Sequence, residues 1–413
     1  MITFTSSTPL PSIPIGTPVD QAIEKIAALG GIESATGAAS TSLPRPPVPS
    51  LEETESKRRS QFYGSQAGEF TPQNPRSILG IVDFEACRNN PNGAAENGVV
   101  IDHFNFCRHR YTGAIHYENG KVKGTLDYRE TQVGSGSRGN REALISAELT
   151  EFKMAGSFNQ SSNLTVYMGT NAKQGQTACR AAGATNPITN TVAKWMGNGF
   201  IGWSILSDEA QGTGDEKIVD CMWLLYQRAA PSGENWTNWY GAPYQDLRFD
   251  SASYLPSKLG VIFSRVTPVM QYSRTDPLVK GVAEHIYTAF TNPNSTLPAT
   301  SNGAKVIPGN IKSTPPSLIT RLYPGANPIA DQAYKDNRAV VSAACSSLPH
   351  NPGEECDEFP FASTWEGAGR GDGNFSVRYV DGTQNGNAGT ALAVWYGSDR
   401  ILHNDKFGVS ILP

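Results

Sequence analysis

The stretch CDEFPFASTWEG, residues 356–367, places two adjacent carboxylates, Asp357 and Glu358, between a cysteine and a Phe-Pro-Phe run. Carboxylates seldom lie beside apolar residues that are expected to be buried unless another group pairs with them or coordinates to them. These residues alone leave two interpretations open. In one, the two acids form a catalytic or metal-binding pair. In the other, Asp357 caps a turn and Glu358 faces water.

Length and composition indicate a chain of two or three domains that is rich in β-structure. The chain has 413 residues, of which 17% are charged, with 41 glycines and 28 prolines. This composition favours strands, turns and loops over long helices. We predict the α+β class, β-rich overall, and no membrane span, because no apolar run of about 18 residues is present. The net charge of −4 argues against a broad basic surface that holds nucleic acid.

The cysteines fall as three successive pairs along the chain, without the C-x-x-C spacing of a structural zinc site. The simplest pairing joins neighbours: Cys87–Cys107, Cys179–Cys221 and Cys345–Cys356. Such disulfides persist in oxidising compartments, so we expect a secreted, extracellular protein. The alternative is a cytosolic protein with six buried thiols. The start of the chain, MITF, lacks the basic and apolar parts of a signal peptide.

Two segments have the composition of tails or linkers. Residues 1–60 are dominated by Pro, Ser, Thr and Gly, and we predict a disordered or extended tail with one short amphipathic helix over residues 19–29. Residues 291–330 are again rich in Pro and Ser, which predicts a linker.

Residues 61–290 are predicted to form a β-rich domain of unknown function. Residues 115–128, IHYENGKVKGTLDY, place Asn-Gly between two alternating arms, which is a strong hairpin signal. Further strands are predicted at residues 77–84, 164–168 and 218–226.

Tryptophan and histidine also concentrate in this region. Five tryptophans could form a platform for sugars or bases, although core filling is the commoner role: Trp195, Trp203, Trp223, Trp236 and Trp239. The string DHFNFCRHR suggests a metal site with His103, His109 and, further on, His116. A zinc site would need a fourth ligand, and Cys107 is better used in a disulfide, so no metal is expected there.

Residues 331–413 show the pattern of a compact last domain. The expected elements follow in order: a helix at 331–346, the acidic loop, a strand at 374–380, a Gly/Asn-rich turn at 381–387, a helix at 388–396, and strands at 400–402 and 407–412. This order brings the start of a helix near a β-hairpin, so that a hard divalent ion could bind between a carboxylate and an Asn oxygen. One such ion with a carboxylate base suffices to hydrolyse a phosphodiester.

The segments CDEFPFASTWEG, FSVRYV, QNGNAG and the terminal DRIL and FGV resemble the NucA/NucB deoxyribonucleases, especially longer actinobacterial and fungal relatives with this domain at the C-terminus. The resemblance covers residues 330–413, and no family is recognised for residues 61–290. It implies a secreted, non-specific endonuclease that cuts DNA with Mg²⁺ or Mn²⁺ at a variant ββα-metal site, in which an Asp replaces the usual His base.

The resemblance also implies roles for single residues. Asp357 would be the base that activates water, and Glu358 would bind or orient the metal. Asn385 would be the metal ligand on the helix, with Asn387 as the competing candidate.

The chain departs from the short members of the family at two places. It has QNGNAG where they have DNRGAG, so one Arg is lost, and its helix has apolar residues where theirs are polar. We therefore expect Glu366 to supply a missing metal ligand. Arg378 and Arg400 are the expected phosphate-binding residues, since Arg suits bidentate phosphate contact, although each could instead pair with a surface carboxylate.

The charge of residues 331–413 leaves other functions open. The segment has six Lys and Arg against eleven Asp and Glu, which is unusual for a nuclease that relies on basic steering. One alternative is a carbohydrate- or cell-surface-binding protein with a degenerate nuclease domain. Another is a toxin, in which residues 61–290 bind a cell-surface or delivery partner.

Overall fold

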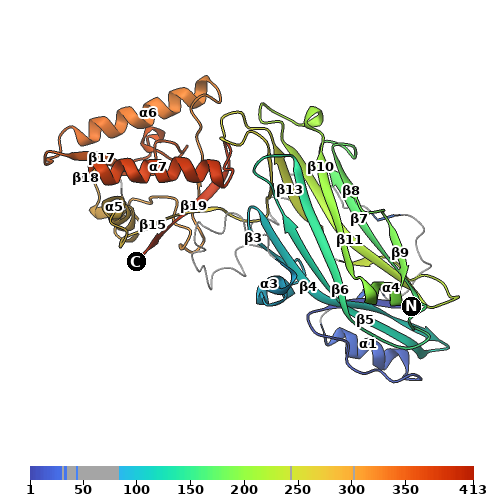
Figure 1. Cartoon of the computed structure of the whole chain (residues 1–413). Helices are drawn as coiled ribbons and strands as arrows, with labels where there is room; N and C mark the ends of the chain where they lie inside the picture. The colour runs from blue at the N-terminus through green and yellow to red at the C-terminus, as the bar shows by residue number, and fades with distance from the viewer. Residues whose placement is uncertain (30–31, 35–42, 45–82, 242–243, 301–302) are drawn as a thin grey trace. The chain divides into compact units, whose positions relative to one another are not determined.

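The computed structural model describes residues 1–29, 32–34, 43–44, 83–241, 244–300 and 303–413. They divide into an N-terminal unit, whose described residues end at Val266, and a C-terminal unit, Thr267–Pro413. Strands dominate the first unit and helices cover strands in the second (Figure 1). The α+β, β-rich fold class is thus confirmed. None of the described helices is both long enough and apolar enough to cross a membrane.

The N-terminal unit contains two sheets that share one buried core. The first has the order β2-β1-β4-β5-β6-β10-β8, with β3 paired to β4, and the second has the order β14-β13-β11-β7-β9, with β12 paired to β11. The bounds in the first sheet are β1 (Ile2–Ser6), β2 (Ile32–Ser34), β3 (Val99–Asp102), β4 (Asn105–Glu118), β5 (Lys121–Ser135), β6 (Glu142–Gly156), β8 (Cys179–Gly183) and β10 (Phe200–Ser207). Those in the second are β7 (Asn163–Ala172), β9 (Ile188–Thr191), β11 (Val219–Ala230), β12 (Tyr240–Gly241), β13 (Gln245–Asp250) and β14 (Gly260–Phe263).

Short helices lie at the ends of these strands: α1 (Val19–Ala27), α3 (Phe84–Arg88), η2 (Pro91–Ala94), α4 (Val192–Gly197) and η3 (Glu209–Gln211). The predicted hairpin is confirmed, because β4 and β5 pair across Asn119 and Gly120. Both turn residues have positive φ, 49° and 73°, as the tight hairpin turn requires.

The first 29 residues are structured, where a tail was expected. β1 pairs antiparallel with β4, and the side chains of Ile2 and Phe4 are fully buried. The helix predicted at 19–29 is present as α1, which buries Ala22 and Ile26. An apolar segment as short as ITFT carries too little periodicity to be told from a tail. Residues 45–60 and 77–82, where the remaining tail and a strand were predicted, lie outside the described residues.

The tryptophans divide into core residues and a stacked pair. Trp195, Trp203 and Trp223 are buried in the core. Trp236 and Trp239 are partly exposed, and the Arg228 guanidinium lies 4.6 and 4.7 Å from their ring centroids. The arginine covers one face of each of these two rings, and a ligand platform here stays a prediction.

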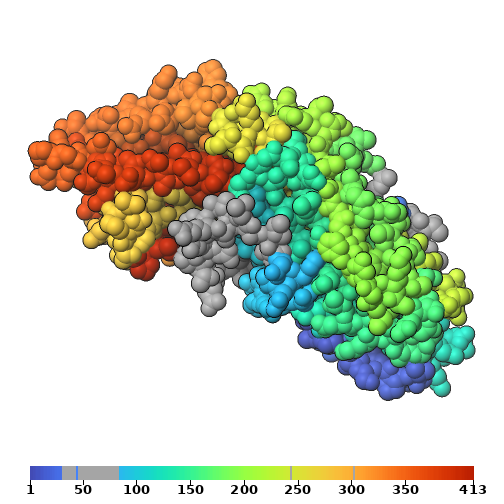
Figure 2. All heavy atoms as spheres, in the orientation of Figure 1, coloured from blue at the N-terminus to red at the C-terminus, as the bar shows by residue number. Residues whose placement is uncertain are grey.

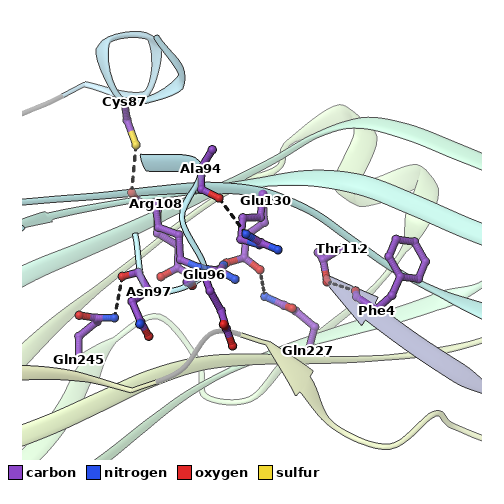
Figure 3. A network of polar contacts seen from close by, with 12 residues as sticks. Phe4, Cys87, Ala94, Glu96, Asn97, Arg108, Thr112, Glu130, Gln227 and Gln245 are labelled. Carbon is purple, nitrogen blue, oxygen red and sulfur yellow. Dashed lines mark hydrogen bonds and ion pairs between the residues drawn. The ribbon is translucent and has the colours of Figure 1, made fainter. Parts of the chain in front are cut away.

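A buried polar network crosses the core of this unit (Figure 3). Arg108 and Glu130 form an ion pair of 3.2 Å with both side chains 1% exposed. Gln227 donates a hydrogen bond to Glu130, and Arg108 donates to the Glu96 carbonyl oxygen. Buried charges require such partners. We therefore interpret Arg108 and Glu130 as structural residues that stabilise each other within the core.

All six cysteines are paired as predicted, with Cα–Cα distances of 5.4, 5.9 and 6.2 Å for the three bonds in chain order. Cys107 is therefore committed to a disulfide. His109 contacts the Asn90 carbonyl oxygen and His116 contacts Ser157.

The C-terminal unit is built around two small sheets. They have the orders β15-β19-β16 and β17-β18. The elements are β15 (Val269–Ser273), α5 (Lys280–Thr291), η4 (Pro293–Ser295), β16 (Ile319–Thr320), α6 (Pro328–Cys345), β17 (Glu354–Phe359), η5 (Ala368–Arg370), β18 (Ser376–Asp381), α7 (Gly382–Ser398) and β19 (Lys406–Leu412). The ββα order expected of the nuclease domain is present as β17, β18 and α7.

The boundaries of this unit differ from the predicted ones. α5 and β15 belong to it, and the segment predicted as a linker contains β16 and the buried Ile307. Within the Gly/Asn-rich segment 381–387, residues 382–387 are helical, because Asp381 caps α7 by accepting from the Gln384 amide at 3.0 Å. Residues 400–402 form no strand, whereas the predicted helix at 331–346 and the strands at 374–380 and 407–412 are present as α6, β18 and β19.

Candidate active site

Asp357 and Glu358 are adjacent on β17, and their side chains contact different helices. Asp357 points to α5, where it contacts His285. Glu358 points to α6, where it accepts from Arg338. Figure 1 shows α5 and α6 flanking the hairpin. The adjacent acids therefore have different partners and different surroundings.

Asp357 is part of a chain of three buried polar side chains. Its Oδ2 lies 2.7 Å from His285 Nδ1, and His285 Nε2 lies 2.6 Å from Ser376 Oγ on β18. Asp357 is 7% exposed, His285 1% and Ser376 0%. Oδ1 of Asp357 has no hydrogen-bond partner among the described residues.

Glu358 is less buried and pairs with a cation. Arg338 Nη1 lies 3.2 and 3.3 Å from its two carboxylate oxygens. Burial and the neighbouring charge of Asp357 raise the pKa of Glu358, while Arg338 opposes this effect. The site thus holds two acids whose environments differ.

A cavity of about 390 Å³ joins these groups to the helices. Asp357, Glu358 and Asn385 line it, together with Arg321 and Arg338. α6 and α7, which contribute to its wall, form part of the surface in Figure 2, in orange and red. Four tyrosines also line the cavity: Tyr272, Tyr323, Tyr334 and Tyr396. Burial raises the pKa of Tyr272 and of Tyr396, so both remain neutral hydrogen-bonding groups.

The two predicted asparagine ligands are placed differently. Asn385 lies in the first turn of α7 and lines the cavity, with its Nδ2 donating to Glu355 at 3.1 Å. Its Oδ1 has no partner among the described residues. Asn387 donates instead to the Leu278 carbonyl oxygen and does not line the cavity.

Three further predicted residues lie outside the cavity lining. Glu366 accepts two hydrogen bonds from Thr320, which places its carboxylate at β16 rather than beside Asp357. Arg378 is exposed on β18. Arg400 is fully buried, so its guanidinium has no access to a phosphate. The structure brings Arg321 and Arg338 to the cavity in their place.

The residues of the cavity fit a hard divalent cation. Carboxylate and amide oxygens are the groups that Mg²⁺ binds, usually one or two carboxylates with water and substrate phosphate. Asn385 Oδ1 has no partner among the described residues, and the Glu358 carboxylate lines the same cavity. Within the described ranges no three His, Cys, Asp or Glu residues cluster tightly enough to hold a metal alone. A cation here would therefore depend on the Glu358 carboxylate, on Asn385, and on water and substrate.

Sequence reasoning missed His285, Arg321 and Arg338. His285 lies on the buried face of α5, between Val282 and Ala289 at helical spacing. That spacing marks His285 as a core position, but nothing local identifies its partner. Arg321 was assigned to a linker, and Arg338 was placed on a helix without a role.

The comparisons with known proteins concern the C-terminal part of the chain. Residues 311–410 match the family model of deoxyribonuclease NucA/NucB, which covers Asp357, Glu358 and Asn385 but not His285. The N-terminal region has no family match. Neither the curated proteins nor the solved structures give a significant match. The chain therefore carries a NucA/NucB deoxyribonuclease domain at residues 311–410.

Proposed function

We propose that the C-terminal unit is a secreted, metal-dependent, non-specific endonuclease that hydrolyses DNA phosphodiester bonds. The observation that carries this proposal is the convergence of Asp357, Glu358 and Asn385 on one cavity within the segment that matches the nuclease family. The cofactor we propose is Mg²⁺ or Mn²⁺.

Asp357 is the general base in this proposal. Its Oδ1 faces no protein partner, so it can take a proton from a water molecule as that water attacks the phosphorus. The P–O bond to the departing nucleotide oxygen then breaks, and that oxygen takes a proton from solvent. A divalent cation bound by Glu358 and Asn385 would supply charge stabilisation of the phosphate and the leaving oxygen.

Arg321 and Arg338 are the phosphate-binding residues we propose instead of the arginines predicted from sequence. Arg321 lies 4.4 Å from the Tyr396 ring centroid and donates to the Ile401 carbonyl oxygen, which fixes its guanidinium at the cavity wall. The side chain of Arg338 is 53% exposed and can therefore reach a phosphate at the mouth. These two cations offset the acidic charge of the unit at the cavity itself.

Cleavage of supercoiled plasmid tests the proposal. Wild type should nick the DNA with Mg²⁺ or Mn²⁺ and stop when EDTA is added. Asp357→Ala should lose about 100- to 10,000-fold in rate, the range that general bases typically contribute. Asp372→Ala removes a carboxylate that pairs with Arg370 outside the cavity, and it should cut like wild type. Intact plasmid with wild type, or equal cutting by Asp357→Ala, would refute the assignment.

Secretion is supported by the three disulfides, which are compatible with an extracellular protein. Mass spectrometry of the non-reduced protein from its native source should find all three bonds. Free thiols there would contradict this part of the proposal. A binding or delivery role for residues 61–290 stays a prediction.

A further inference from the structure

Three elements of the C-terminal unit meet in one hydrogen-bonded chain: Ser376 from β18, His285 from α5 and Asp357 from β17. The contacts of 2.6 and 2.7 Å are short and entirely inside the unit. His285 on α5 and Asp357 on β17 are 72 residues apart in the sequence. Such a chain of polar groups is conspicuous in an otherwise apolar core.

The exposure of Ser376 and Asp357 shows which of these two side chains a substrate can reach. The composition Ser-His-Asp would suggest a nucleophilic serine. Ser376, however, is fully buried and does not line the cavity, whereas Asp357 does. A substrate can therefore reach the carboxylate and not the hydroxyl, which excludes the serine-hydrolase mechanism and makes Ser376 the inner anchor.

The hydrogen bonds determine how the imidazole is oriented. A carboxylate only accepts, so His285 Nδ1 carries the hydrogen that is donated to Asp357 Oδ2. Nε2 can then accept from the Ser376 hydroxyl. Both ring nitrogens therefore have partners, and His285 is buried on α5 together with Val282 and Ile286.

We infer that His285 is a positioning residue for the nuclease reaction: it holds Asp357 Oδ2 and thereby leaves Oδ1 directed at the water in the cavity. This inference rests on the proposed function. It also implies that the catalytic machinery extends beyond the matched segment 311–410, because α5 ends at Thr291.

Two substitutions in the intact 413-residue chain test the roles of the two ring nitrogens of His285 separately. In His285→Asn the amide replaces Nδ1 and can still donate to Asp357, whereas in His285→Gln it reaches the Nε2 position near Ser376. We expect kcat for a DNA duplex to fall about 100-fold in His285→Gln, with KM within about twofold, because small misplacements of reacting groups have effects of this size. His285→Asn should retain kcat within about tenfold of wild type. His350→Gln, at an exposed histidine stacked on Tyr379, is the matched control and should cut like wild type.

The outcomes distinguish this inference from the proposed function. The melting temperature of each variant is measured together with its kinetics. A lower kcat in His285→Gln than in His285→Asn at similar melting temperatures supports the positioning role. If wild type is active and His285→Gln cuts as fast, or if both variants lose activity only in proportion to unfolding, the inference is overturned alone. An inert wild type overturns the proposed function and this inference with it.

Discussion

The disulfide Cys345–Cys356 joins the end of α6 to the strand that carries Asp357, one residue before it. The double substitution Cys345→Ala and Cys356→Ala tests how far this bond holds the acidic pair in place. Alanine is the better replacement at Cys345, which is 2% exposed, because a serine hydroxyl there would need a buried partner.

The loss of stability follows from the length of the loop that the bond closes. The separation of 11 residues corresponds to about 3 kcal/mol of loop-closure entropy in the unfolded chain. Neighbouring apolar contacts of Val341, Phe375 and Val377 remain, so the unit should stay folded. Because β17 is no longer linked to α6 beside Asp357, we also expect kcat to fall about tenfold. This is less than the roughly 100-fold loss that a 1 Å misplacement of a reacting group can cause.

The assay is plasmid cleavage below the unfolding temperature, together with thermal unfolding followed by calorimetry. Removal of Cys179–Cys221 provides the matched control in the N-terminal unit. Its separation of 42 residues predicts a larger loss, about 4 kcal/mol, but no change in kcat. If cleavage by the Cys345/Cys356 variant equals that of wild type while its stability falls, the bond does not position the acidic pair, and the reasoning fails.

Two further predictions concern charge. Burial raises the pKa of Asp127 to about 6, and its Oδ2 has no hydrogen-bond partner, so the native state holds a proton that the unfolded chain releases near pH 4. The free energy of unfolding should therefore fall by about 3 kcal/mol as pH rises from about 4 to 6. Asp127→Asn should be more stable than wild type at pH 7.5 but not at pH 4. An equal difference in unfolding free energy between the two proteins at both pH values would contradict this. Arg338→Ala should raise KM for DNA about tenfold with a small change in kcat, measured by initial rates, because a charged phosphate contact is lost. Arg370→Ala, outside the cavity, should leave KM unchanged, and an equal rise in both variants would count against a role for Arg338.

Local patterns in the sequence were sufficient for several elements of the structure. Asn119-Gly120 specifies a turn with positive φ, so the hairpin follows from two residues. Nearest-neighbour pairing of the cysteines was correct because short loops close most easily. The segment 356–367, together with FSVRYV, QNGNAG and the terminal DRIL and FGV, indicated the nuclease family whose model matches residues 311–410.

Tertiary packing overrode the local pattern elsewhere. The Gly/Asn-rich segment 381–387 has low helix propensity, yet it is helical because Asp381 caps α7 and Ala388, Leu392 and Tyr396 are buried further along it. Glu366 and Arg400 were chosen by residue type, but their backbone positions direct them to β16 and to the interior.

The sequence by itself therefore determined the acidic pair Asp357-Glu358 and the similarity of residues 311–410 to the NucA/NucB deoxyribonucleases. The tertiary structure alone decided that the two acids have different partners, His285 for Asp357 and Arg338 for Glu358. The physical reason is the range of the interactions. Turns, caps and strand alternation depend on neighbouring residues, whereas the His285–Asp357 contact joins side chains 72 residues apart and exists only after α5 has packed against β17.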